Sequence, residues 1–166
     1  TSVSFGTDVI TEGGQDGDKY LATTSVGNGK IMAIARSANN YANSPSQYYT
    51  HARIFTISGT SVTFGTMVSA SGTKTPSNGA YGCCYDSNTD RVVVFYGHSY
   101  TLYARVGTVS GSSISFGSEI DTGYGLNTGD FLFPIFDPST NKIVLPFADY
   151  DNSNLTKAIV GTVSGS

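Results

Sequence analysis

The hexapeptide SVTFGT at residues 61–66 decides the fold, because two close variants of it occur elsewhere in the chain. They are SVSFGT at residues 2–7 and SISFGS at residues 113–118. In each copy Val or Ile and then Phe alternate with Ser or Thr, which is the period-two pattern of a half-buried β-strand. Recurrence at roughly 50 to 60 residues indicates a repeat architecture.

Two further sets of related segments support the repeat. The first set reads ARIFTISG at residues 52–59, ARVGTVSG at 104–111 and AIVGTVSG at 158–165, and each copy ends in Ser-Gly. The glycine provides the positive φ that a tight hairpin needs. The second set pairs YDSNTDRVVVF at residues 85–95 with FDPSTNKIVL at 136–145. Here Asp, Asn, Pro and Ser favour a turn, and the strand that follows is apolar on both faces, as in a central strand.

These segments combine into a unit of four antiparallel strands joined as a meander. In the first unit we expect strands at residues 20–25, 30–36, 49–57 and 61–68. No segment has helical periodicity. We therefore predict an all-β fold of three tandem four-stranded antiparallel units in a single repeat domain, with units at approximately residues 1–59, 60–111 and 112–166.

The sequence leaves the arrangement of the three units open. Propeller-like blades are the leading prediction, although a propeller typically has about four or more blades. A threefold β-prism or β-trefoil also contains three four-stranded repeats, but a trefoil usually carries a repeated Gln-x-Trp motif and this chain has no Trp. A stacked solenoid or fibre is the remaining alternative.

The two ends of the chain are complementary. Residues 160–166 followed by residues 1–6 recreate the hairpin pattern of residues 57–65, so the last unit lacks a fourth strand and residues 1–10 supply a spare one. We expect this strand to complete the last unit of its own chain, which closes a ring, or a unit of a neighbouring chain, which joins copies by strand addition. The candidate assembly residues are Val3, Phe5, Val160 and Val163.

The connections that vary between units are expected to lie at one end of the sheets. Variable loops on a repeated scaffold are typical of a recognition surface, and Tyr, Ser, Gly and Asn dominate adaptable binding loops. The alternative is that these loops are unconstrained, solvent-exposed turns. The candidate ligand-binding residues are Tyr41, Tyr100, Tyr124 and Tyr150.

Composition argues against two classes of partner. Charged residues make up 13% of the chain, and the net charge is −3 with no cluster of Lys and Arg, so we expect no nucleic-acid partner. No apolar stretch approaches the roughly 20 residues of a membrane helix, so we expect no membrane insertion.

The chain starts inside a repeat without an initiator Met, and we expect it to be a processed product or an excised piece.

Catalytic and metal-binding patterns are weak or missing in the sequence. His51 and His98 have no second histidine placed for a metal site, and residues 149–154 only loosely resemble a calcium loop. Glu12 and Glu119 follow the fourth strand of two units and are interpreted as surface residues. No Gly-x-Ser-x-Gly elbow or pair of glycosidase carboxylates is present. We therefore predict that the chain is not an enzyme and has no cofactor and no metal site.

The only two cysteines, Cys83 and Cys84, are adjacent. Neighbours on a strand point to opposite faces, so we interpret them as two small buried side chains that do not bond to each other. An intermolecular bridge or a redox site is the alternative.

The repeats resemble those of repeat-rich bacteriophage tail-fibre and structural proteins with propeller-like β repeats. The residues that carry the resemblance are 107–118, Tyr85-Asp86-Ser87-Asn88 and Arg91-Val92-Val93-Val94, and the likeness extends over all three units. The first unit departs most, because Gly27-Asn28-Gly29 replaces the turn that begins with Asp. The resemblance implies a large assembly, repeated β modules and contact with a host surface, and it brings no catalytic residue.

The leading functional hypothesis is a non-enzymatic structural or adhesive module of a phage-type fibre or extracellular filament, assembled through β-strand complementation. A carbohydrate-binding lectin domain is the main alternative, and a secreted matrix or surface-layer protein is a third. The expected partners are other copies of the chain, further repeats of the same chain, and cell-surface glycans. The expected location is the virion or the outside of the cell.

Overall fold

The computed structural model consists of β-strands and one short 3-10 turn in the part of the chain that it describes. The described residues are 2, 5–8, 19–37, 49–72, 80–127 and 130–164. The strands form three antiparallel sheets, which confirms the predicted all-β class and the three antiparallel units. No helix in this part of the chain is long and apolar enough to cross a membrane.

Sheet 1 has the strand order β1-β2-β3-β4, and a short strand β5 also pairs with β3. Its strands are β1 (Lys19–Ser25), β2 (Lys30–Ser37), β3 (Tyr49–Ser58), β4 (Ser61–Phe64) and β5 (Val68–Ser69). These bounds lie within a residue or two of the strands expected from the sequence, except where the fourth strand is interrupted.

Sheet 2 repeats this topology, and sheet 3 is smaller. In sheet 2, β9 and β10 both pair with β8, next to β7 and β6. The strands of sheet 2 are β6 (Tyr81–Asp86), β7 (Arg91–His98), β8 (Thr101–Ser110), β9 (Ser113–Phe116) and β10 (Ile120–Gly125). Sheet 3 has the order β11-β12-β13, with β11 (Ile135–Asp137), β12 (Lys142–Asp149) and β13 (Leu155–Gly161), and the 3-10 turn η1 (Tyr150–Asn152) joins β12 to β13.

The predicted fourth strand is split by a β-bulge in sheets 1 and 2. Along β3, Phe55 lies opposite Phe64 whereas Ala52 lies opposite Val68, so the register shifts by one residue between β4 and β5. The same shift recurs along β8 between β9 and β10. One extra residue on one strand is the mark of a bulge, which bends the strand and increases its twist. The expected four continuous strands per unit are therefore corrected to sheets of five, five and three strands.

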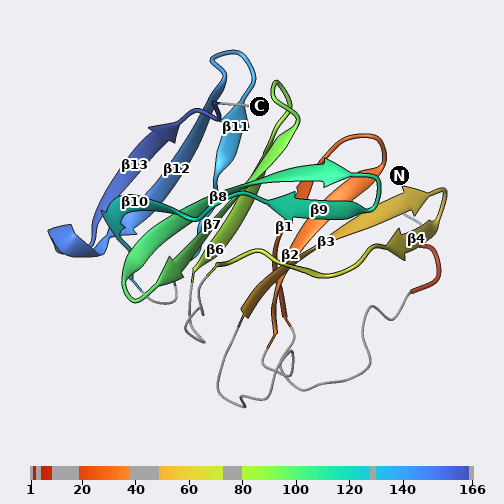
Figure 1. The fold of residues 1–166 in the computed structure, drawn as a ribbon, viewed down its shortest axis with the longest axis horizontal. Coiled ribbons are helices and arrows are strands. Elements are labelled where there is room, and N and C mark those ends of the chain that lie inside the picture. The colour runs from red at the N-terminus through yellow and green to blue at the C-terminus, as the bar shows by residue number, and fades with distance from the viewer. Residues whose placement is uncertain are drawn as a thin grey trace.

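Two apolar cores hold the sheets face to face in chain order (Figure 1). The first core joins sheets 1 and 2 and contains Val26, Met32, Ile34, Ala52, Ile54, Ala70, Tyr81, Cys83, Val92, Val94, Tyr96 and Ile114. The second joins sheets 2 and 3 and contains Ala80, Cys84, Val93, Phe95, Leu102, Ala104, Leu126, Leu132, Ile143, Leu145 and Phe147. Sheet 2 is therefore covered on both faces.

Strands β6 and β7 have apolar residues on both faces because both faces are buried. Along β7, Val92 and Val94 enter the first core while Val93 and Phe95 enter the second. This alternation confirms the prediction of a central strand. Asp86, at the end of β6, forms the expected turn, since its Oδ1 accepts hydrogen bonds from the backbone N–H groups of Asn88 and Thr89 at 2.9 and 3.1 Å.

The connection after β4 packs closely on sheet 2, and this contact can be tested. A methyl group at Gly65 would lie 1.8 Å from the carbonyl oxygen of Ser112, whereas one at the equivalent Gly117 would meet only the Val106 oxygen, at 3.6 Å. We expect Gly65→Ala to lower the free energy of unfolding by about 1–3 kcal/mol, because backbone atoms must move apart. Gly117→Ala should leave it nearly unchanged. Denaturant unfolding followed by circular dichroism measures both, and equal effects would contradict this packing.

The two cysteines lie in different cores and should be chemically inert in the folded protein. Cys83 belongs to the first core, Cys84 belongs to the second, and neither is in a disulfide. Burial raises the pKa of each thiol from 9.0 to about 12, so almost no thiolate forms at pH 8. We expect no reaction with Ellman's reagent in native protein and two reactive thiols in denaturant. A Ser87→Cys variant, with a thiol at an exposed position, should react at once. Rapid labelling of native wild-type protein would contradict the burial of this strand.

Candidate functional site

The outer edge of β13 has no partner strand among the described residues. β13 pairs with β12 on one side. The corresponding third strands of the other sheets, β3 and β8, pair on both sides, with β4 and β9 as their outer neighbours. An unpaired edge leaves a row of backbone N–H and C=O groups available to another strand.

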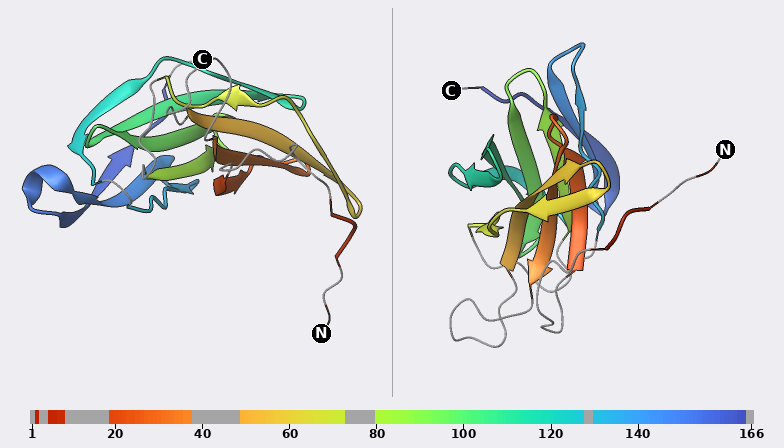
Figure 2. Two further views of the ribbon diagram at one scale, coloured as in Figure 1. Left: turned by 90° about the horizontal axis from the view of Figure 1, so that it is seen from below. Right: turned by 90° about the vertical axis from the view of Figure 1, so that its right-hand side faces the viewer.

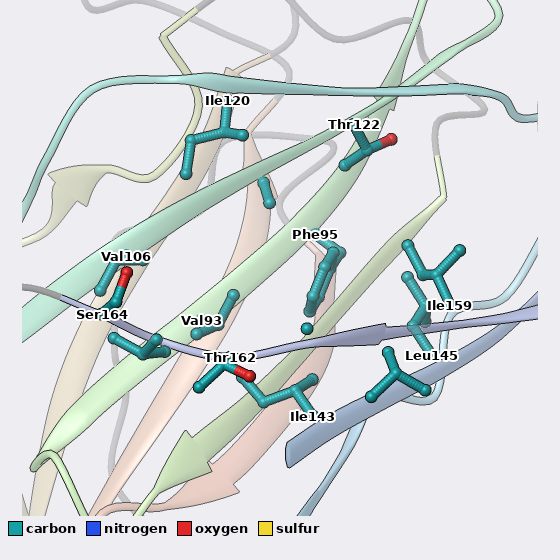
Figure 3. A pocket seen from close by; sticks show the side chains of 14 residues that line it. Val93, Phe95, Val106, Ile120, Thr122, Ile143, Leu145, Ile159, Thr162 and Ser164 are labelled. Atoms are coloured by element: carbon teal, nitrogen blue, oxygen red, sulfur yellow. The ribbon is translucent and has the colours of Figure 1, made fainter. Parts of the chain in front are cut away.

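An apolar cavity lies beside this edge, between sheets 2 and 3. Its volume is about 270 Å³. Figure 3 shows Val93 and Phe95 of sheet 2 across the cavity from Ile143 and Leu145 of sheet 3. The full lining is Val93, Phe95, Ala104, Val106, Ile120 and Thr122 from sheet 2, with Ile143, Leu145 and residues 159–161 from sheet 3 and residues 162–164 directly after it. None of these side chains titrates, so the cavity suits apolar side chains rather than acid–base chemistry. We call the unpaired edge and this cavity the β13 slot.

In sheet 2 the fourth strand occupies the place that corresponds to the β13 slot. There Phe116 of β9 lies opposite Gly107 of β8, and a methyl group at Gly107 would come within 2.8 Å of the Phe116 ring. Ile114 of β9 is 4% exposed and belongs to the first core. Gly161 is the equivalent of Gly107 in unit 3, and nothing lies within 4 Å of a methyl group placed there. The position that a Phe ring covers in sheet 2 is therefore open in sheet 3.

Gly6 of the N-terminal segment lies against sheet 1 as Gly65 lies against sheet 2. A methyl group at Gly6 would come within 2.2 Å of the carbonyl oxygen of Thr60, and one at Gly65 within 1.8 Å of that of Ser112. Thr60 and Ser112 occupy the same turn, between the third and fourth strands of their units. Figure 2 shows the described N-terminal residues, in red, beyond sheet 1 and far from the blue sheet 3. Gly6 therefore contacts sheet 1 at the turn that corresponds to the one that Gly65 contacts on sheet 2.

Three of the four predicted assembly residues fall on these two regions. Phe5 is 89% exposed and Val160 is 63% exposed. Val163 lines the cavity and packs against the second core. Val3 lies outside the described residues. The structure does not bring Phe5 to β13 of its own chain.

Two arginines at one repeat position hold the outer strand by cation–π contacts, a role that the sequence analysis missed. The guanidinium of Arg53 lies 4.7 Å from the ring centre of Phe64, and that of Arg105 lies 5.5 Å from that of Phe116. The repeated Ala-Arg pair ahead of each fourth strand was the available signal. Unit 3 has Ile159 at this position, so an aromatic ring in the β13 slot would meet an apolar side chain.

Two of the four predicted ligand-binding tyrosines meet on the surface. Tyr100, in the turn between β7 and β8, stacks on Tyr150 of η1 with ring centres 4.8 Å apart, and they are 50% and 45% exposed. Tyr124 of β10 is 37% exposed and packs edge-on against Phe147 at 5.5 Å. A backbone hydrogen bond connects the turn of Tyr100 to the end of β10, because the N–H of Leu126 donates to the carbonyl of Tyr100 at 2.8 Å. Tyr41 lies outside the described residues.

The turn that carries Tyr100 has an unfavourable backbone. Ser99 and Tyr100 have φ angles of 50° and 64°, a pair of left-handed residues joining β7 to β8. Such turns favour Asn and Gly, and a residue with a Cβ pays roughly 1–2 kcal/mol in this region. A bulky Tyr at this position is an outlier of the kind that occurs at functional sites.

Asp149 fixes η1 and is not free to bind a cation. Its carboxylate accepts hydrogen bonds from the Lys157 ammonium, from Asn152 Nδ2 at 2.6 Å and from the N–H of Asp151 at 3.2 Å. The hydrogen bond from Lys157, followed by that from Asn152, holds the pKa of Asp149 below its ordinary value. Across the described ranges, no three His, Cys, Asp or Glu side chains are grouped closely enough to hold a metal ion.

Glu119 differs from its interpretation as a surface residue. It is partly buried and accepts a hydrogen bond from the hydroxyl of the fully buried Tyr96. Desolvation, then this hydrogen bond, raises the pKa of Tyr96. The pair lies at the margin of the first core and is structural. Glu12 lies outside the described residues.

No protein-family model matches the chain, and no significant match was found among curated proteins or among solved structures.

Proposed function

We propose that the chain is a non-enzymatic structural or adhesive module of a phage-type fibre or extracellular filament, which acts on the virion or outside the cell. Its copies join by β-strand complementation, and its units are arranged as propeller-like blades. One observation carries the proposal: the slot above Gly161 is open, whereas the equivalent place above Gly107 holds Phe116 of the outer strand.

The N-terminal sequence fits the β13 slot in the register of the repeat. SVSFGT at residues 2–7 matches SISFGS at residues 113–118 position by position. In the register of β9 on β8, Phe5 of one copy covers Gly161 of another and Val3 lies beside Val163. Strand addition of this kind gains affinity from main-chain hydrogen bonds and specificity from pockets for alternate side chains. Burial of one Phe side chain contributes about 1.5–3 kcal/mol.

The stacking of the sheets supports blades over the alternatives. Each core lies between two consecutive sheets, as between neighbouring blades, and the described residues of the three sheets do not gather in one central core as a prism requires. A closed propeller typically has about four or more blades. Further blades therefore come from additional copies or additional repeats. The fibre context is supported by the resemblance of the repeats to tail-fibre proteins.

Strand complementation predicts two complementary monomeric variants. Phe5→Glu removes the donor side chain, and Gly161→Leu places a side chain in the slot, where nothing lies within 4 Å of the Cβ that it adds. We expect each variant alone to be monomeric by light scattering, with self-association weakened at least about 100-fold. An equimolar mixture should form dimers with one working joint, and wild type should form longer species visible by electron microscopy.

Ser115→Leu is the matched control for the acceptor, because it adds the same side chain at an exposed position of β9. It should assemble like wild type. A wild-type chain that stays strictly monomeric at high concentration would refute the proposal, as would Phe5→Glu or Gly161→Leu chains that assemble normally.

A carbohydrate-binding function is the second candidate, supported by the exposed Tyr100–Tyr150 stack and its strained turn. Stacked aromatic rings on a surface offer an apolar platform for the faces of sugar rings, and the Asn and Ser residues beside them offer hydrogen bonds. This surface lies at one end of sheets 2 and 3, so it remains compatible with assembly through β13.

Tyr100→Asn separates stability from ligand binding. Asn tolerates a positive φ, so relief of roughly 1–2 kcal/mol of strain offsets the loss of an aromatic stack of about 0.5–1.5 kcal/mol. We expect the melting temperature to change little while binding to glycans of host surfaces is lost. Tyr85→Phe, in strand β6 and outside this surface, should bind like wild type. A glycan array with no wild-type binder would eliminate the lectin function.

A further inference from the structure

The cavity of the β13 slot is preformed in the single chain. Its walls belong to two packed sheets, and the wall residues Val93, Phe95, Ile143 and Leu145 are at most 7% exposed. Figure 3 shows these side chains around the cavity. The volume of about 270 Å³ exceeds the roughly 150 Å³ of an apolar protein cavity that takes up benzene. The cavity therefore has room for one aromatic ring with a substituent or for two fused rings.

The lining favours a neutral, apolar ligand. No charged side chain lines the cavity, and its hydroxyl groups are those of Thr122, Thr162 and Ser164. The Thr122 hydroxyl donates to the carbonyl of Leu102 at 2.7 Å, and the Thr162 hydroxyl accepts from the Lys142 ammonium at 2.7 Å. Among the described residues, no buried polar atom that lacks a partner belongs to this lining. A charged group in the cavity would lose its hydration without gaining a partner, which is unfavourable.

The equivalent place in sheet 2 holds an aromatic ring. A methyl group at Gly107 would lie 2.8 Å from the Phe116 ring and 2.7 Å from the Val92 side chain, so both cover this glycine. In sheet 3, Gly161 takes the place of Gly107 and Ile143 the place of Val92. Nothing lies within 4 Å of a methyl group at Gly161. The same floor is therefore present in sheet 3 without its ring.

The wall of the slot differs from sheet 2 at the position of the arginine. The guanidinium of Arg105 lies 5.5 Å from the ring centre of Phe116. Ile159 stands at this repeat position in unit 3 and lines the cavity. A ring in the slot would contact hydrocarbon where the ring of sheet 2 faces a cation. This exchange disfavours an acidic ligand, because the wall has no positive charge to pair with it.

We propose that the β13 slot binds a small neutral aromatic compound of one or two rings, in the place over Gly161 that Phe5 of a second copy takes in the proposed assembly. Binding of the compound requires only the single chain. The compound and the N-terminal strand exclude each other, and this competition rests on the proposed function. A bound compound blocks addition of the next copy, so the slot couples assembly to the presence of aromatic molecules.

The test uses the Phe5→Glu chain, in which the slot is open and the competing ring is absent. Fluorobenzene is titrated into this chain, and fluorine NMR measures its binding. We expect saturable binding, whereas para-fluorobenzoate, which adds a carboxylate to the same ring, should bind at least about 10-fold more weakly. Addition of Gly161→Leu should weaken fluorobenzene binding at least about 10-fold, because the new side chain occupies part of the cavity.

The controls separate filling of the slot from loss of the fold. Gly161→Leu should fold like the parent chain, because Gly161 is exposed, has no positive φ angle and has no atom within 4 Å of the added Cβ. Ser115→Leu adds the same side chain at an exposed position outside the lining and should leave fluorobenzene binding unchanged. A synthetic peptide of residues 1–10 should displace the bound fluorobenzene.

The outcomes distinguish this inference from the proposed function. Fluorobenzene binding that does not saturate, or that Gly161→Leu leaves unchanged, overturns the ligand site while strand complementation still stands. Equally tight binding of para-fluorobenzoate overturns the selection of a neutral ligand. Fluorobenzene that binds in the slot but is not displaced by the peptide overturns the competition and counts against strand complementation. A wild-type chain that binds fluorobenzene in the slot but never assembles supports the ligand site and rejects the proposed function.

Discussion

The packing of β7 between two apolar cores is the interaction on which the rest of the structure depends. Val92 and Val94 enter one core and Val93 and Phe95 enter the other, so a single strand holds three sheets together. A strand that is apolar on both faces is stable in water only when sheets cover both sides. The face-to-face stack, the place of each outer strand and the proximity of Tyr100 to Tyr150 all follow from this sandwich. So does the outer face of sheet 3, where Phe131, Phe133 and Ile135 are exposed and no described sheet packs on them.

Much of this architecture could be predicted from local patterns. Three local patterns locate almost every strand, because each pattern is decided by residues adjacent in sequence. They are the alternation in SVTFGT, the Ser-Gly hairpins, and the turns that begin with Asp86 and Asp137. The bulge between β4 and β5 was missed, since nothing in residues 65–67 alone distinguishes an extra residue from a continued strand. The contacts of Arg53, Arg105 and Glu119 were missed because their partners come from other strands. The exposed Tyr100–Tyr150 stack required the stacking of sheets 2 and 3, which no local pattern encodes.

The places where the three units differ carry the functional argument. At one position of the third strand the units have Phe55, Gly107 and Gly161, and the two that have a described outer strand place a Phe of that strand opposite. Two residues earlier on the same strand, the units have Arg53, Arg105 and Ile159. If all three units had the same residues at these positions, any outer strand could pair with the third strand of any unit. The loss of the arginine in unit 3 makes its slot more apolar than the places that β4 and β9 occupy, which suits a strand arriving from elsewhere.

The open slot along β13 has a consequence for growth. In the proposed assembly, strand addition gives every oligomer two chemically different ends, one with a free N-terminal strand that carries Phe5 and one with the open β13 slot above Gly161. Addition of a copy at either end regenerates the same end, so length is not self-limiting unless the curvature closes a ring. A copy defective at one end only would act as a chain terminator at that end, and small amounts of it would set the length distribution without changing the structure of the joint.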